Sequence, residues 1–174
     1  MTRWTDKHGS RAQQRTCSVA EPAGLLDTNI FIHAHAHDAL SEECRRFLAA
    51  LETGDVVAYL EPITLHELSY ALPHYVKQMT RVQVANYLLM VLAWEAVQGQ
   101  KGIMVDAVER WRVTAGLSFA DAYLSAVAAG QGRPIYSKNV RELAAQGVQL
   151  PNPLPASEAP GSHPDVVDGG RGAG

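Results

Sequence analysis

The stretch Leu25-Leu26-Asp27-Thr28-Asn29 decides how this chain folds. Gly24 and the two leucines predict a short apolar strand that ends at Asp27. An aspartate at this point is either a turn or helix-cap residue, since Asp, Thr and Asn all favour such positions, or a functional carboxylate. Ligand groups of an open α/β sheet lie beyond the carboxyl ends of its strands, so both interpretations stay open.

Strand and helix signals alternate on the C-terminal side of this stretch. Apolar runs predict further strands at residues 56–60, 134–136 and 148–150, and a short apolar segment at 103–105. Helical periodicity predicts helices at residues 41–53, 64–75, 80–97, 106–115, 118–130 and 140–145. We expect Ser41 to cap the first helix, Gly54 to end it, and Pro73 to kink or end the second. Strands separated by helices favour a parallel α/β sheet that is covered on both faces.

Length and composition fit one globular domain. The chain has 174 residues, of which 47% are hydrophobic and 19% charged, as in ordinary globular proteins. Polar residues 1–23 and Pro/Gly-rich residues 155–174 predict disordered tails, which leaves 24–154 as the domain. The net charge of -3 argues against a protein that coats nucleic acid by bulk positive charge. No apolar run is long enough to span a bilayer, and the two cysteines lack zinc-type spacing, so we expect a cytoplasmic protein.

Three carboxylates stand near strand ends. Asp27 follows the first strand, Glu67 follows the second, and Asp121 begins the helix before the third. The structural alternative for Glu67 is a capping box with Thr64, and Asp121 has the same spacing from Ser118. If the three acids converge, a divalent cation would relieve their repulsion. Hard oxygen ligands select Mg²⁺ or Mn²⁺, and such a site favours phosphodiester hydrolysis.

A fourth group follows the predicted third strand. Ser137 and Asn139 supply side-chain oxygens there, and Glu142 lies one helical turn further on. Lys138 and Arg141 lie in the same segment and are the candidates for binding RNA phosphates. The structural alternative for this group is an ordinary helix cap followed by a solvated helix face.

The motifs around these residues resemble those of a PIN domain, most of all the VapC-like toxin ribonucleases. They are Leu25-Leu26-Asp27-Thr28-Asn29-Ile30, Ile63-Thr64-Leu65-His66-Glu67-Leu68, Leu117-Ser118-Phe119-Ala120-Asp121-Ala122, and Ile135-Tyr136-Ser137-Lys138-Asn139-Val140-Arg141-Glu142. The resemblance implies a three-layer α/β/α fold with a mainly parallel central sheet. It also implies an Mg²⁺- or Mn²⁺-dependent endoribonuclease, a homodimer, and inhibition by a cognate antitoxin protein.

The resemblance also implies roles for individual residues. Asp27, Glu67 and Asp121 match the acidic triad of the family and would be both catalytic residues and metal ligands. Asn139 stands at a fourth catalytic position where many relatives have an aspartate, and Glu142 is the alternative source of that charge. The supporting residues would be Ser137, Thr28 and Asn29.

Two other interpretations remain. His33, His35 and His37 form a His-x-His-x-His pattern, which resembles the His-x-His metal motif of amidohydrolase-type barrels. Such barrels need about 250 residues, so we expect a solvated loop instead. A PIN-like scaffold with a weakened fourth position would be an RNA- or protein-binding module rather than an enzyme. The broad apolar stripe on residues 80–97 fits either a core helix or a dimer or antitoxin surface.

Overall fold

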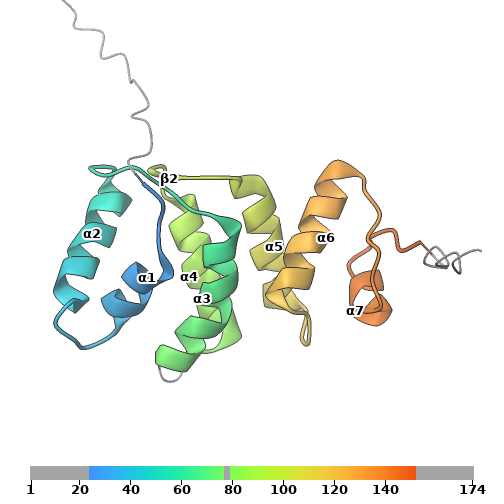
Figure 1. The fold of residues 1–174 in the computed structure, drawn as a ribbon, viewed down its shortest axis with the longest axis horizontal. Coiled ribbons are helices and arrows are strands. Elements are labelled where there is room, and N and C mark those ends of the chain that lie inside the picture. The colour runs from blue at the N-terminus through green and yellow to red at the C-terminus, as the bar shows by residue number, and fades with distance from the viewer. Residues whose placement is uncertain (1–23, 77–78, 152–174) are drawn as a thin grey trace, which may run out of the picture.

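The computed structural model describes residues 24–76 and 79–151. They form, in chain order, α1 (Thr28–His35), α2 (Ser41–Thr53), β1 (Ala58–Tyr59), α3 (Pro62–Tyr75), α4 (Arg81–Ala93), β2 (Val97–Gln98), α5 (Lys101–Val113), α6 (Phe119–Gln131) and α7 (Val140–Ala144). Figure 1 shows α2 at one end of the row of helices and α7 at the other. None of these helices has the length and apolar character needed to cross a bilayer. The tails predicted for residues 1–23 and 155–174 lie outside the described residues and stay a prediction.

A small parallel sheet holds the start of the domain in place. β1 pairs in parallel with β2, with Ala58 opposite Val97, and a parallel bridge joins Leu25 to Tyr59 on the other side of β1. The bridge is closed by hydrogen bonds from Leu26 N–H to Tyr59 O (2.8 Å) and from Tyr59 N–H to the oxygen of Gly24 (2.9 Å). β1 is therefore the central segment, and Asp27 comes directly after its neighbour, as predicted.

The sheet is smaller than the sequence predicted. Residues 134–136 and 148–150 do not form strands, although Ile135 N–H donates to Gln149 O at 2.9 Å. Pro134 has no N–H to donate, which limits pairing along this segment. The apolar residues 103–105 belong to α5, which begins at Lys101 rather than at residue 106.

The helix predicted at 80–97 is also too long. α4 ends at Ala93, and Val97 and Gln98 form β2. Continuous apolar periodicity concealed this boundary, because no Gly or Pro lies between residues 80 and 98 to mark the end of the helix. Gly99 has φ +143, and a Cβ on it would lie 2.6 Å from the backbone oxygen of Leu60, so only glycine fits where the chain leaves β2.

Helix starts differ from the predictions in two further places. Leu40, not Ser41, is the N-cap of α2, although Gly54 ends that helix as expected. The histidine pattern is a loop only at His37, because His33 and His35 lie in the last turn of α1. Two residues apart on a helix, they point in different directions and do not form a metal pair.

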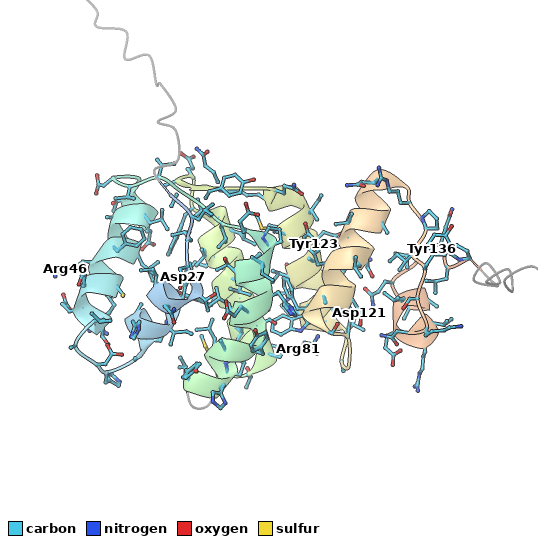
Figure 2. All side chains as sticks on the ribbon, viewed as in Figure 1. Asp27, Arg46, Arg81, Asp121, Tyr123 and Tyr136 are labelled. Carbon is cyan, nitrogen blue, oxygen red and sulfur yellow. The ribbon has the colours of Figure 1, made fainter. Side chains whose placement is uncertain are left out.

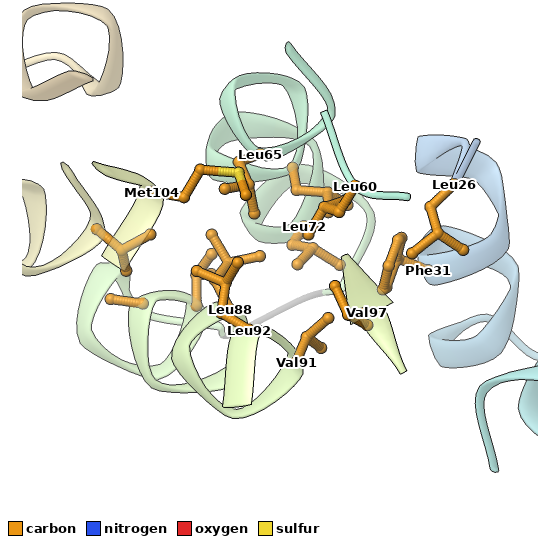
Figure 3. Packing of buried hydrophobic residues seen from close by; sticks show 14 of the residues in the cluster. Leu26, Phe31, Leu60, Leu65, Leu72, Leu88, Val91, Leu92, Val97 and Met104 are labelled. Carbon is orange, nitrogen blue, oxygen red and sulfur yellow. The ribbon is translucent and has the colours of Figure 1, made fainter. Parts of the chain in front are cut away.

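One apolar core joins α1 to the other helices and the sheet. Figure 3 shows Leu26 and Phe31 on one side of this core and Met104 on the other, with residues of α3 and α4 between them. Phe31, Leu65 and Leu88 are fully buried. Since burying such a side chain contributes about 1.5–3 kcal/mol, the core fixes α1 and α3 firmly against each other. This packing positions Asp27, which directly precedes α1, and Glu67, which lies within α3.

Candidate active site

Asp27 caps α1 and keeps one carboxylate oxygen free of that task. Its Oδ1 accepts a hydrogen bond from Asn29 N–H at 2.7 Å, so the cap interpretation is correct. Within residues 24–76 and 79–151, no hydrogen bond reaches Oδ2. The side chain is exposed. Asn29 supports the site through its backbone N–H.

Glu67 is held by α1 rather than by a capping box. α3 begins at Pro62 with Glu61 as its N-cap, so Thr64 is already inside the helix and its Oγ donates to the oxygen of Leu26 at 3.1 Å. The Oε2 atom of Glu67 instead accepts a hydrogen bond from the hydroxyl of Thr28 at 2.6 Å. The capping-box interpretation is therefore wrong. Thr28 is 4% exposed, so the donor is rigidly placed beside Asp27.

Asp121 is the centre of a second group of polar side chains. Its Oδ2 accepts hydrogen bonds from the hydroxyl of Ser118 at 2.9 Å and from Nδ2 of Asn139 at 3.0 Å. Ser118 also caps α6 by accepting from Asp121 N–H at 3.0 Å. Ser137 accepts from Asn139 N–H at 3.0 Å and so orients the residue that contacts Asp121.

The remaining predicted residues surround this second group. Glu142 lies in the first turn of α7, half-buried, and makes no hydrogen bond or ion pair in the described part of the chain. Asn139, not Glu142, therefore contacts Asp121. Lys138 and Arg141 are exposed and flank Asn139, where a phosphate could reach them.

The carboxylates thus form two groups, one where Glu67 of α3 meets the start of α1 and one at the start of α6. In Figure 2, Asp27 lies at the start of α1 and Asp121 at the start of α6, with α3 between them in this view. No hydrogen bond joins the groups among the described residues. The same residues contain no set of three His, Cys, Asp or Glu side chains close enough to hold a metal ion. The predicted convergence of Asp27, Glu67 and Asp121 into one site therefore stays a prediction.

The chemistry of the donors fits a hard divalent cation. Asp27, Glu67 and Asp121 each have one carboxylate oxygen with no hydrogen-bond partner in the part of the chain described, and none is paired with Lys or Arg there. Oxygen ligands with uncompensated charge are those that Mg²⁺ and Mn²⁺ select.

Arg81 is a positioning residue that sequence patterns did not predict. Its guanidinium donates to the backbone oxygens of Trp111 (2.6 Å) and Leu117, and lies 4.7 Å from the centroid of the Trp111 ring. Burial lowers its pKa. Leu117 directly precedes Ser118, so this contact fixes the segment that presents Asp121. The two contacts span 30 and 36 residues, and no local pattern reveals them.

Together, the fold and the site define an α/β protein that presents acidic side chains beyond its parallel strands. A sequence model of the PIN domain family matches residues 24–141, more than half of the chain. Searches of curated proteins and of solved structures found no match to this chain. The chain belongs to the PIN domain family. PIN domains have a three-layer α/β/α fold, so the predicted fold class is confirmed. They are typically nucleases that act on nucleic acids with divalent metal ions.

Proposed function

We propose that this protein is an Mg²⁺- or Mn²⁺-dependent endoribonuclease that acts as the VapC-like toxin of a toxin–antitoxin pair. One observation carries the proposal. Glu67 and Asp121 are the two carboxylates, among the described residues, that accept a side-chain hydrogen bond from more than five residues away along the chain. Other carboxylates there bond only to near neighbours. The fold thus brings distant donors to two of the three acids that match the family motif, while Asp27 accepts only from Asn29 in the part of the chain that is described.

Both distant donors are uncharged, and this supports the binding of a cation. Thr28 orients Glu67, and Asn139 orients Asp121, without neutralising either carboxylate. A lysine or arginine in the same place would compensate the charge and compete with a metal ion. Neutral donors fix the geometry and leave the negative charge available, which is what a metal ligand needs.

Each residue has a separate role in this proposal. Asp27, Glu67 and Asp121 would hold the metal ion, and a divalent cation bound there would supply activation of a water molecule and stabilisation of charge on the attacked phosphate. Asn139 positions Asp121. Exposed Lys138 and Arg141 would contact phosphates next to the scissile one, because phosphate contacts carry most RNA affinity.

Metal-dependent cleavage tests the enzymatic part. The purified full chain is incubated with structured RNA in Mg²⁺, beside Asp121→Asn and a control, Asp55→Asn, whose carboxylate contacts only Thr53. We expect cleavage by the parent and the control, none in EDTA, and a loss of at least 100-fold in Asp121→Asn. Cleavage by Asp121→Asn at the parental rate would refute the assignment.

The toxin role has its own tests. Expression of the chain in the cytoplasm without a partner should arrest cell growth, and Asp121→Asn should relieve the arrest. Coexpression with the neighbouring reading frame should yield a copurifying antitoxin, and light scattering of the purified chain should give the mass of a homodimer. Arrest that persists in Asp121→Asn would show that catalysis is not its cause.

An RNA- or protein-binding module is the second candidate. It is favoured by the amide of Asn139 at the fourth position and by the two separate carboxylate groups among the described residues. In the same assay, equal RNA retention by the parent and Asp121→Asn, without cleavage by either, would support this function instead.

A further inference from the structure

An apolar hollow lies between α3 and α6. Its volume is about 370 Å³, and it is lined by Pro62, Ile63, His66, Phe119, Ala120, Tyr123 and Leu124. This volume falls within the range of about 300–1,000 Å³ typical of small-molecule sites. His66 directly precedes Glu67, and Ala120 directly precedes Asp121. The hollow is therefore built from the two helices that carry Glu67 and Asp121, although neither carboxylate lines it.

The aromatic side chains of the hollow are held in fixed positions. Phe119 is 3% exposed, and its ring packs against Trp111 with the centroids 5.9 Å apart. On the other side, the Phe119 and His66 rings are 6.2 Å apart, tilted by 36°. The Tyr70 and His66 rings pack in a T-shaped arrangement with their centroids 5.6 Å apart. These rings form a continuous series from α5 to α3, which fixes the positions of Phe119 and His66.

The hollow offers flat ring surfaces rather than polar partners. Nδ1 of His66 makes no hydrogen bond to the described residues, but it is buried, so a ligand in the hollow does not reach it. A ligand with a flat apolar face would bury the exposed ring surfaces instead. A nucleobase has this property, because every base has a π-face.

We propose that this hollow binds one nucleobase of the RNA substrate, next to the phosphate that is cleaved. The base would lie against the Tyr123 and His66 side chains, while its phosphate reaches the carboxylates that these two helices carry. This inference rests on the proposed ribonuclease function, and it names how the enzyme selects where to cut. Figure 2 shows Tyr123 further along α6 than Asp121, so both side chains come from one rigid helix.

Removing single bases from a substrate tests this directly. One oligoribonucleotide that the full chain cleaves is selected from a mixed-sequence pool and resynthesised with an abasic site at each position near the cut. We expect one abasic position to lower kcat/KM by about five- to a hundredfold, the usual effect of losing one stacked base. Tyr123→Ala should lower kcat/KM on the intact RNA by a similar factor and show no further loss with that abasic substrate, because both changes remove the same contact.

Two more variants keep the test decisive if Tyr123→Ala does not fold. Ile63 is 68% exposed, so Ile63→Trp should fold, fill the hollow, and slow cleavage of intact RNA but not of the abasic RNA. Tyr75→Ala removes an aromatic side chain, 63% exposed, from the other end of α3 and should behave as the parent.

The outcomes separate this inference from the function on which it rests. If the parent cleaves no RNA, the proposed function fails and the inference fails with it. If the parent cleaves but the losses from Tyr123→Ala and base removal multiply at every position, the function stands and the base site is refuted. A change in molecular mass in Tyr123→Ala, with no change in base dependence, would also refute it and identify the hollow as a protein interface.

Discussion

Replacing Asn139 with aspartate turns a hydrogen bond into a repulsion at a defined place. In the protein, Nδ2 of Asn139 donates to Oδ2 of Asp121 at 3.0 Å. The variant Asn139→Asp puts a second acceptor where the donor was, and brings two negative charges together. The same change supplies a fourth carboxylate beside Asp121. It should therefore destabilise the protein without metal and strengthen its response to metal.

The structure sets the size of both effects. A hydrogen bond to a charged group contributes about 1.5–3 kcal/mol, and this is lost. Two charges 4 Å apart repel by about 4 kcal/mol near a protein surface, which must be discounted because both side chains are only half-buried. We expect a net loss of about 2–4 kcal/mol in metal-free buffer, or a fall in Tm of about 5–15 °C. Mg²⁺ at 100 times its Kd would return about 2.7 kcal/mol.

Thermal unfolding with and without Mg²⁺ measures these terms. Asn139→Ala serves as the first control, because it loses the same hydrogen bond but adds no charge, so Mg²⁺ should not rescue it. Asn86→Asp serves as the second, since Asn86 already accepts from Arg112 and the new charge is paired. If Asn139→Asp is as stable as the parent without metal and gains no more from Mg²⁺, then residue 139 is not part of a metal site.

Three further changes test the site and the fold. Thr28→Val keeps the size of Thr28 but removes the donor to Glu67, and should lower kcat/KM on RNA about tenfold while costing about 1 kcal/mol of stability; an unchanged rate would contradict the positioning role. Gly99→Ala would place a Cβ 2.6 Å from the backbone oxygen of Leu60 at a residue with φ +143, and should lower the free energy of unfolding by roughly 2–4 kcal/mol. An unchanged midpoint of urea unfolding would contradict the steric argument. The hydrogen bond with His33 lowers the pKa of Asp38, so its stabilisation is complete above the pKa of an unfolded aspartate, about 3.9, and is lost as the pH falls through the lower folded value. The stability difference between the parent and Asp38→Asn should accordingly be constant near pH 7 and shrink below about pH 4, and parallel acid-unfolding curves would show that the pair does not act this way.

Local sequence patterns predicted the features that local chemistry controls. Asp27 ends an apolar run and caps the helix that follows, and Ser118 caps α6 because its hydroxyl is three residues before an available N–H. Gly54 ends α2 in a left-handed conformation that glycine adopts easily. Each of these signals lies within four residues, so the sequence contains all the information needed.

Features that depend on distant contacts were missed. Val97 and Gln98 continue an apolar helical pattern, yet pairing with β1 makes them a strand. Thr64 and Glu67 have the spacing of a capping box, but Pro62 starts the helix earlier, and both side chains bond to segments about 38 residues away. Tertiary packing overrides local propensity in both cases. For Glu67, the failure of the local pattern is itself informative, because sites of function are where local rules tend to be broken.

The contacts of three arginines support the proposal that a metal ion binds Asp121. Arg110 and Arg112 pair with the nearby acids Asp106 and Glu109, as expected of surface helices. Arg81, whose contacts fix the segment leading to Asp121, gives its guanidinium to two backbone oxygens instead of a carboxylate. A protein selected for stability alone would gain from directing that charge to Asp121, since a hydrogen bond between charged groups contributes more than one to a neutral oxygen. Keeping the cation on the backbone fixes the segment and leaves the carboxylate of Asp121 without a paired arginine or lysine among the described residues, as the proposed binding of a metal ion requires.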